Sequence, residues 1–221
     1  MTARATRSGE PRDTLTRERV LRAAIELADE RGIDALTMRE LARKLGVEGG
    51  SLYYHVAGKG DLLDGMTDLV AAEIEVPSGS SDWKEAMRRR AISARDVFSR
   101  HPWAAGLIDS RGPSGPGSLS YVDRVLGTLL QAGFSPGIAA HAFLALDSYI
   151  YGFERQRSNL SLGDDAVTTE TAQDYLAAIP QGAYPSLACV AMEYAVRPYD
   201  DAAAFDFGLD LILDSLERLL E

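Results

Sequence analysis

The sequence predicts an all-α protein with a small three-helix N-terminal domain followed by a larger helical C-terminal domain. Apolar residues recur at helical spacing from Leu15 to the end of the chain. The run Pro77-Ser78-Gly79-Ser80-Ser81 interrupts this pattern as a linker between domains would. The 221 residues suffice for one large domain or for a small and a larger one, and the linker favours two.

The N-terminal residues are predicted to form an arm and then a compact domain. Residues 1–13 are polar and basic without an apolar face, so we expect a flexible basic arm. It is either an untethered terminus or an arm that reaches a nucleic-acid backbone. Residues 14–60 begin with a helix that stops at Gly32. Its buried face is predicted to contain Val20, Ala23, Ala24, Leu27 and Ala28.

Two shorter helices are predicted after Gly32. Thr37 to Glu40 has the sequence of a capping box, in which the Thr37 hydroxyl accepts from a backbone N–H and the Glu40 carboxylate reaches back. This helix ends at Gly46, and a further helix is predicted from Glu48 to Val56. The layout predicts a helix-turn-helix, whose second helix can present its outward side to a DNA major groove.

Candidate DNA-contacting residues lie on that outward side and on its flanks. Arg39 could fork onto a guanine edge or hold a phosphate, and hydroxyl, aromatic and ammonium groups nearby are placed for phosphate contacts. Two glycines either let the backbone approach another surface closely or merely loosen a turn. The predicted DNA-binding residues are Thr37, Arg39, Gly49, Gly50, Ser51, Tyr53, Tyr54, His55 and Lys59.

Residues 61–221 are predicted to form the second domain, with a helix over 61–75 as its connector. Two later helices carry long apolar stripes: Ala139, Phe143, Leu146, Ile150 and Phe153 in one, and Phe205, Leu209, Ile212, Leu216 and Leu219 in the other. The last helix is apolar beyond one face, so it is either a central core helix or half of a dimer interface. The predicted helices are 82–99, 103–108, 118–132, 136–155, 171–178, 184–195 and 202–220.

Charge is distributed unevenly along the chain. Residues 1–60 hold 11 Lys and Arg against 9 Asp and Glu, a net +2, and residues 61–221 hold 12 against 24, a net −12, which sum to −10. The N-terminal domain is therefore the surface that a duplex could approach. The sequence shows neither a signal peptide nor an apolar run of about 18 residues. We expect a soluble cytoplasmic protein without a membrane partner, in which Cys189 is a buried structural thiol.

The N-terminal motif reads Leu36-Thr37-Met38-Arg39-Glu40-Leu41-Ala42, then Leu45-Gly46-Val47, then Ser51-Leu52-Tyr53-Tyr54-His55-Val56, with Lys59 and Leu62-Leu63 behind it. Over about residues 14–66 these residues resemble the DNA-binding signature of the tetracycline-repressor family. The likeness continues through Ser81-Asp82-Trp83, Gly133-Phe134-Ser135 and the segment from Phe205 to Glu217, which resemble the C-terminal domain of the tetracycline repressor itself.

The resemblance implies a ligand-responsive transcriptional repressor. Such a protein has a C-terminal ligand-binding and dimerisation domain, and forms a homodimer through the helices near 136–155 and 202–220, packed as a four-helix bundle. Each protomer places one recognition helix on half of a palindromic operator in double-stranded DNA. A small-molecule effector shifts the helix over 61–75 and releases the operator. No cofactor is implied.

Several positions differ from those at which the tetracycline repressor holds its drug and divalent metal. Ile108 stands for a metal-binding histidine, Gln156 for a glutamate, Glu75 for a pocket histidine and Arg90 for a pocket asparagine. Aliphatic and amide groups do not replace imidazole and carboxylate ligands, so no metal site and an effector other than metal-tetracycline are predicted. The predicted effector-binding residues are Glu75, Arg90, Trp103, Ile108, Val125, Phe143, Asp147 and Tyr151.

Arg90 has two interpretations. Its guanidinium either grips an acid or a carbonyl of the effector, or pairs with Asp147 or Glu75 within the core. An enzyme is not predicted, because the three histidines lack metal-ligand spacing and Cys189 has no partner base in the sequence. The alternative to a repressor is a helical small-molecule-binding or protein-interaction module without specific DNA binding.

Overall fold

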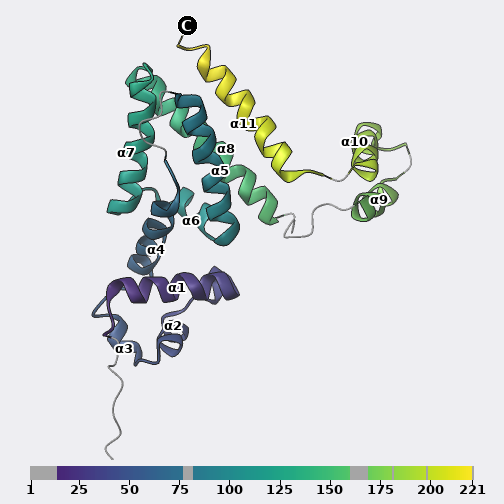
Figure 1. The fold of residues 1–221 in the computed structure, drawn as a ribbon. Coiled ribbons are helices and arrows are strands. Elements are labelled where there is room, and N and C mark those ends of the chain that lie inside the picture. Colours follow the sequence, from purple (N-terminus) through teal and green to yellow (C-terminus); the bar gives the residue numbers. More distant parts are fainter. Residues whose placement is uncertain (1–13, 77–81, 160–168, 181, 198, 221) are drawn as a thin grey trace, which may run out of the picture. The chain divides into compact units, whose positions relative to one another are not determined.

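All regular elements of the described chain are helices, so the all-α prediction is confirmed (Figure 1). The chain divides into two compact units, Met1–Met66 and Thr67–Glu221. Among the described helices, none combines the length and the apolar character that a bilayer span requires. The computed structural model describes residues 14–76, 82–159, 169–180, 182–197 and 199–220. The predicted arm over 1–13 and the linker over 77–81 lie outside these ranges.

The first unit contains α1 (Arg17–Arg31), a 3-10 turn (Ile33–Ala35), α2 (Met38–Leu45), α3 (Gly49–Leu52) and the start of α4 (Lys59–Glu73). Local caps set the limits of α2. The Thr37 hydroxyl accepts a hydrogen bond from the Glu40 backbone N–H at 3.1 Å, and Gly46 ends the helix at φ +67°. Leu41 and Leu52 are fully buried, so α2 and α3 pack inward.

Two local predictions in this unit were wrong. The helix expected from Glu48 to Val56 is only the four residues of α3, and a turn follows it. Val56 is nevertheless buried, so the turn satisfies the apolar pattern that suggested a helix. The Glu40 carboxylate does not complete the capping box. It pairs with Arg43 at 2.7 Å and with Arg31 at 3.4 Å instead, and the Arg43 hydrogen bond lowers the pKa of Glu40.

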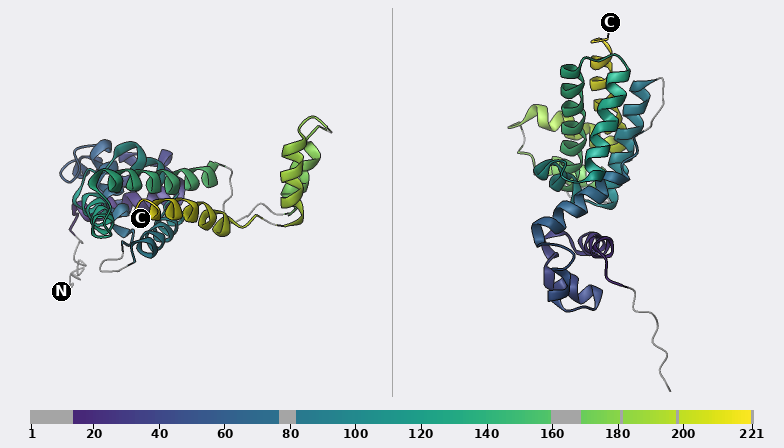
Figure 2. Two further views of the ribbon diagram at one scale, coloured as in Figure 1. Left: turned by 90° about the horizontal axis from the view of Figure 1, so that it is seen from above. Right: turned by 90° about the vertical axis from the view of Figure 1, so that its left-hand side faces the viewer.

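Helix α4 contributes residues to both units, because the division falls after Met66. The second unit continues with α5 (Trp83–Arg100), α6 (Ala104–Arg111), α7 (Pro116–Gln131), α8 (Pro136–Asn159), α9 (Thr169–Ala178), α10 (Pro185–Val196) and α11 (Asp201–Glu217). Helix α8 packs against α5, α6, α7 and α11, so it is the central helix of this unit (Figure 2).

The core of the second unit follows the predicted stripes closely. Leu146 and Ile150 of α8 are fully buried, as are Phe205 and Leu209 of α11. Leu219, at the end of the predicted α11 stripe, is 59% exposed. The stripe therefore continues beyond what one protomer buries.

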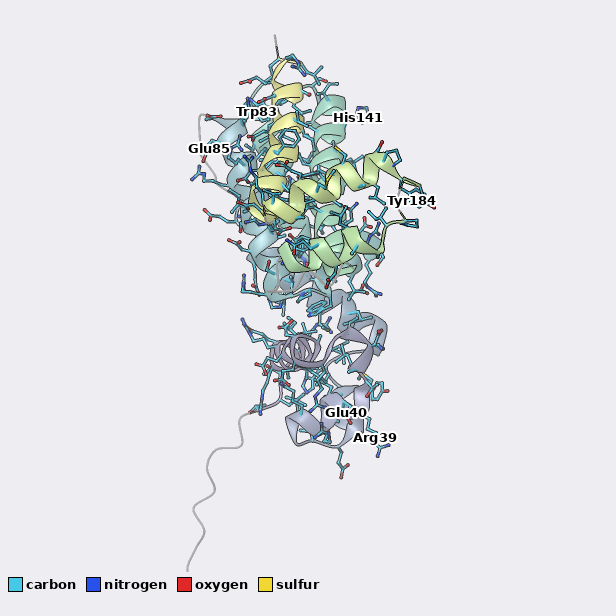
Figure 3. All side chains as sticks on the ribbon, turned by 90° about the vertical axis from the view of Figure 1, so that its right-hand side faces the viewer. Arg39, Glu40, Trp83, Glu85, His141 and Tyr184 are labelled. Carbon is cyan, nitrogen blue, oxygen red and sulfur yellow. The ribbon has the colours of Figure 1, made fainter. Side chains whose placement is uncertain are left out.

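Helices α9 and α10 pack against one another. The prediction of a buried Cys189 was wrong, because its side chain is exposed on α10. Its neighbours Val190 and Met192 are 55% and 52% exposed, and Tyr184, just before α10, is 57% exposed (Figure 3). An apolar stretch of sequence thus lies on the surface of the protomer.

Asp68 of α4 caps the start of α7. Its carboxylate accepts hydrogen bonds from the backbone N–H of Gly117 at 3.2 Å and of Ser118 at 2.8 Å, and from the Ser118 hydroxyl at 2.9 Å. The first N–H groups of a helix have no partner within it, and a carboxylate there is favourable. The approach is close, because a Cβ on Gly117 would lie 2.6 Å from the Asp68 carbonyl oxygen. Glycine at 117 is therefore required for α7 to begin against α4.

This contact predicts opposite effects for two glycines of α7. Gly117→Ala should lower the free energy of unfolding, because the new methyl group meets the backbone of α4. Gly127→Ala should raise it by roughly 0.5–1 kcal/mol, because alanine favours the helix and no protein atom lies within 4 Å of the new Cβ. Urea unfolding followed by circular dichroism measures both. Equal effects of the two substitutions would contradict the close contact.

Candidate nucleic-acid interface and ligand cavity

The predicted DNA-binding residues lie at the surface of the first unit. Tyr53 and Tyr54 are 57% and 89% exposed, which is high for tyrosine. Arg39 is exposed and points away from its helix (Figure 3). Ser51 and His55 are half-buried. The other predicted residues, Thr37, Gly49, Gly50 and Lys59, are exposed.

Neither packing nor backbone conformation requires glycine at the start of α3. A Cβ at Gly49 or Gly50 would meet no protein atom within 4 Å, and neither residue has a positive φ. The reason for glycine there lies in flexibility of the turn or in a surface outside the protomer.

A brace that the sequence did not indicate holds this region. The Arg17 guanidinium donates to both carboxylate oxygens of Asp61, at 2.8 and 2.6 Å, and to the backbone carbonyl of His55 at 2.9 Å. Asp61 also accepts from the Ala57 backbone N–H at 2.8 Å. The Arg17 hydrogen bond, followed by that of Ala57, lowers the pKa of Asp61 to about 2. The brace joins α1 and α4 to the turn that follows α3.

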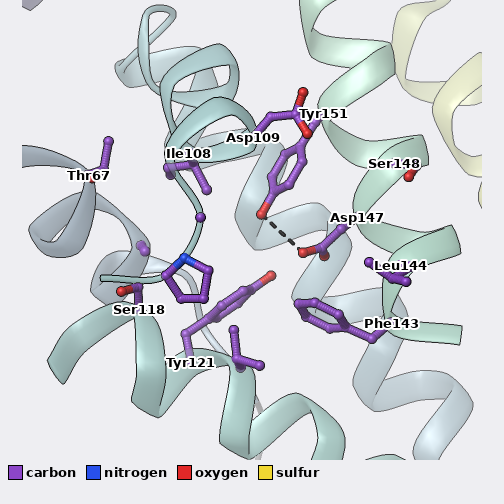
Figure 4. A pocket seen from close by; sticks show the side chains of 14 residues that line it. Thr67, Ile108, Asp109, Ser118, Tyr121, Phe143, Leu144, Asp147, Ser148 and Tyr151 are labelled. Atoms are coloured by element: carbon purple, nitrogen blue, oxygen red, sulfur yellow. Dashed lines mark hydrogen bonds between the residues drawn. The ribbon is translucent and has the colours of Figure 1, made fainter. Parts of the chain in front are cut away.

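A cavity of about 220 Å³ lies in the second unit (Figure 4). Its wall is mostly apolar and aromatic, with a few polar groups, as is usual for sites that bind small organic molecules. Helices α4, α6, α7 and α8 and the segment between α6 and α7 contribute its residues, which are Thr67, Ala71, Ile108, Asp109, Gly112, Pro113, Ser118, Tyr121, Val122, Phe143, Leu144, Asp147, Ser148 and Tyr151.

The structure brings half of the predicted effector-binding residues together. Ile108, Phe143, Asp147 and Tyr151 line the cavity. The other four, Glu75, Arg90, Trp103 and Val125, do not belong to the lining.

Each residue outside the lining has a physical reason for its position. Glu75 lies beyond the end of α4, where its side chain is exposed and its backbone N–H donates to the Ser93 hydroxyl at 2.9 Å. Trp103 and Val125 are buried, at 9% and 0% exposed, in the core around the cavity. The Glu75 side chain is therefore in solvent, and those of Trp103 and Val125 pack in the core.

Arg90 lies behind the cavity wall with its side chain fully buried. Its Nη2 group donates to an Asp147 carboxylate oxygen and to the Tyr121 hydroxyl, and its Nε group donates to the same hydroxyl at 2.7 Å. The second Asp147 oxygen accepts from the Tyr151 hydroxyl at 3.1 Å, and burial raises the pKa of Tyr151. Of the two interpretations of Arg90, the structure shows the pairing with Asp147.

Tyr121, Asp109 and Ser118 are polar lining residues that the sequence did not single out. Their helices were predicted, but an isolated tyrosine, aspartate or serine on an amphipathic helix carries no signal of a cavity. Within the described ranges, no three His, Cys, Asp or Glu side chains are grouped so as to hold a metal ion.

Comparisons with known proteins agree with this arrangement. Two family models match: "Bacterial regulatory proteins, tetR family" over residues 20–66 and "Tetracyclin repressor-like, C-terminal domain" over residues 76–220. The chain is 32% identical to the HTH-type transcriptional repressor DrrR1 of Streptomyces coeruleorubidus, across 95% of this chain and 80% of that one. It is 31% identical to the class A tetracycline repressor protein of Escherichia coli, across 90% and 89%.

A solved structure is also similar over most of its length. The TetR family protein ActR of Streptomyces coelicolor, in complex with actinorhodin, superimposes with a TM-score of 0.80 at 29% identity. The match covers 94% of this chain and 99% of that chain.

A helix-turn-helix unit and a helical unit with a cavity, joined in one chain, define a transcriptional regulator that combines DNA binding with ligand binding. The chain belongs to the tetracycline-repressor family of DNA-binding regulators. Members of this family are not enzymes, and they bind DNA and small molecules, typically as dimers.

The Arg17–Asp61 brace predicts an acid-dependent loss of stability. Because the folded-state pKa of Asp61, about 2, lies below its ordinary value of 3.8, the brace acts fully above about pH 4 and is lost as the pH falls toward 2. Asp61→Asn should lower the free energy of unfolding at pH 6, by about 1 kcal/mol or less because the pair is partly exposed. The difference in free energy of unfolding between wild type and this variant should become smaller toward pH 3.

Urea unfolding at pH 6, 4 and 3 measures this gap. Asp34→Asn, an exposed carboxylate of the same unit, is the matched control. A gap for Asp61→Asn that stays constant or widens in acid would show that the brace does not depend on the Asp61 charge.

Proposed function

We propose that this protein is a cytoplasmic, homodimeric repressor that binds a palindromic operator and leaves it when an effector other than metal-tetracycline fills the cavity. The exposed outward face of the helix-turn-helix, with Tyr53, Tyr54 and Arg39, is the observation that carries the proposal. Solvent-exposed aromatic and guanidinium groups, next to glycines that allow close approach of another molecule, are typical of a surface that binds nucleic acid. Two relatives, DrrR1 and the class A tetracycline repressor, are named as repressors.

DNA binding should therefore depend on this face. Arg39→Ala and Tyr53→Ala should each weaken binding to the promoter region of the protein's own gene by about tenfold or more, because each removes base or phosphate contacts. Arg197→Ala is the control, since the side chain of that arginine, just after α10, is 82% exposed and the same charge is removed. A mobility-shift titration measures the affinities. Wild-type binding by both variants would contradict the assigned face, and no specific binding by wild type would favour an interaction module.

The release step is supported by the path of α4. This helix supplies Thr67 and Ala71 to the cavity wall, and its earlier turns belong to the first unit. A ligand that is accommodated best by one position of α4 therefore shifts the population of that position, and with it the affinity for DNA. Ile108 in the lining, an aliphatic group where the tetracycline repressor is expected to bind metal, supports an effector without a metal.

The dimer is supported by apolar residues that the protomer leaves exposed on two packed helices. Leu144 of α8 is 59% exposed, and Phe207 and Leu211 of α11 are 69% and 56% exposed. Helices α8 and α11 pack against each other, so these residues can form one surface. Contiguous exposed apolar surface of this kind usually marks an interface, and two such helix pairs form a four-helix bundle.

A charge placed on this surface should separate the protomers. Leu211→Glu should shift the dimer to monomer at low micromolar concentration, because the carboxylate would be buried without a partner. Leu119→Glu is the matched control, since Leu119 is 55% exposed on α7. Light scattering coupled to size exclusion gives the mass. A dimer that survives Leu211→Glu, or that is lost equally in Leu119→Glu, would place the interface elsewhere.

A further inference from the structure

We infer that the effector is a flat aromatic molecule, neutral or cationic, that presents a carbonyl acceptor beside a hydroxyl or amine donor, and that carboxylate-bearing molecules are disfavoured. The inference rests on the proposed function, because it names the ligand class of the same cavity. It follows from which polar groups reach the cavity and which are already occupied.

The charge of the cavity wall is the first argument. Asp109 and Asp147 belong to the described lining, and no lysine, arginine or histidine does. Arg90 lies behind the wall, fully buried, with its guanidinium paired to Asp147. An anionic ligand would lie against the Asp109 and Asp147 carboxylates, and Asp147 already supplies the countercharge of Arg90, whose buried Nη1 group has no hydrogen-bond partner among the described residues. The wall therefore selects against anions.

Tyr121 is the second argument. Its phenolic oxygen accepts from the Nε and Nη2 groups of Arg90, so its own proton must point elsewhere. Among the described residues no acceptor for this proton is found, and the ring lines the cavity (Figure 4). A ligand carbonyl oxygen would take the proton. A carbonyl is thus bound by Tyr121, with Arg90 polarising the phenol from behind.

The two carboxylates are the third argument. One Asp147 oxygen accepts from Tyr151 at 3.1 Å, and a carboxylate has about four lone-pair sites, so it can accept from a ligand as well. Asp109 is exposed at the cavity wall and adds a second acceptor. Hydroxyl or amine donors on the ligand fit these groups. The rings of Tyr121, Phe143 and Tyr151 line the cavity and can pack against a flat aromatic molecule.

One nearby cation could hold an acid instead. An adjoining cavity of about 200 Å³ shares Asp109, Ser148 and Tyr151 with the first and is also lined by Arg155, an exposed side chain. A carboxylated ligand would therefore have to depend on Arg155, which makes Arg155→Ala an informative variant.

Isothermal titration calorimetry with three probes tests the inference: a dihydroxyanthraquinone, its aminomethyl derivative and its carboxylate derivative. We expect the first two to bind and the carboxylate to bind at least about tenfold more weakly. Asp109→Asn should reduce the preference for the amine over the neutral probe, and Asp123→Asn, on the exposed surface of α7, should not. Arg155→Ala should leave all three affinities unchanged.

Three results would overturn the inference: tighter or equal binding of the carboxylate, loss of binding in Arg155→Ala, or no binding by any probe. These titrations use the protein without DNA. Failure of the ligand class is therefore distinguishable from failure of the proposed repressor function, which the mobility shift measures with ligand-free protein.

Discussion

The buried guanidinium of Arg90 constrains the packing of the C-terminal unit. A full charge inside an apolar core is tolerated only when it is paired and hydrogen-bonded. Asp147 of α8 supplies the countercharge, and Tyr121 of α7 supplies a neutral acceptor. Removal of one partner of a buried pair typically costs about 3–5 kcal/mol, so the packing of α5 against α7 and α8 must keep these groups together.

The same constraint determines the chemistry of the cavity. Tyr121 and Asp147, which accept hydrogen bonds from Arg90, also line the cavity, so their remaining donor and acceptor sites are available to a ligand. No lysine, arginine or histidine is among the described lining residues. Asp68 ties the start of α7, and with it Ser118 of the wall, to α4. In the proposed release step, a ligand that moves this end of α7 would act on α4 through these hydrogen bonds. The hydrogen bonds that pair Arg90 in the core therefore also determine which polar groups the cavity presents to a ligand.

Sequence pattern predicted the elements well where apolar period and cap residues agree, as at Thr37 and Gly46. It failed for α3, because an apolar pair such as Leu52 and Val56 is buried equally well by a helix or by a turn. It did not choose between Asp147 and Glu75 as the partner of Arg90. That choice depends on helix packing between residues far apart in the chain, which no local spacing encodes. For the same reason, four of the eight predicted residues lie outside the cavity lining, and ten of the fourteen lining residues were not predicted.

The apolar residues that remain exposed carry information of their own. Periodicity in a sequence reflects burial in the assembled protein, whereas the structure of one chain shows only the burial within a protomer. Leu219 belongs to the apolar stripe predicted for residues 202–220 yet lies just after α11 and is 59% exposed, and Val190 on α10 is exposed although its sequence is that of a core. The proposed interface on α8 and α11 accounts for the exposed end of the last stripe, and the exposed side of α10 is a separate apolar surface. The folded protomer would then be stable chiefly as part of the dimer, so its apparent stability should depend on protein concentration.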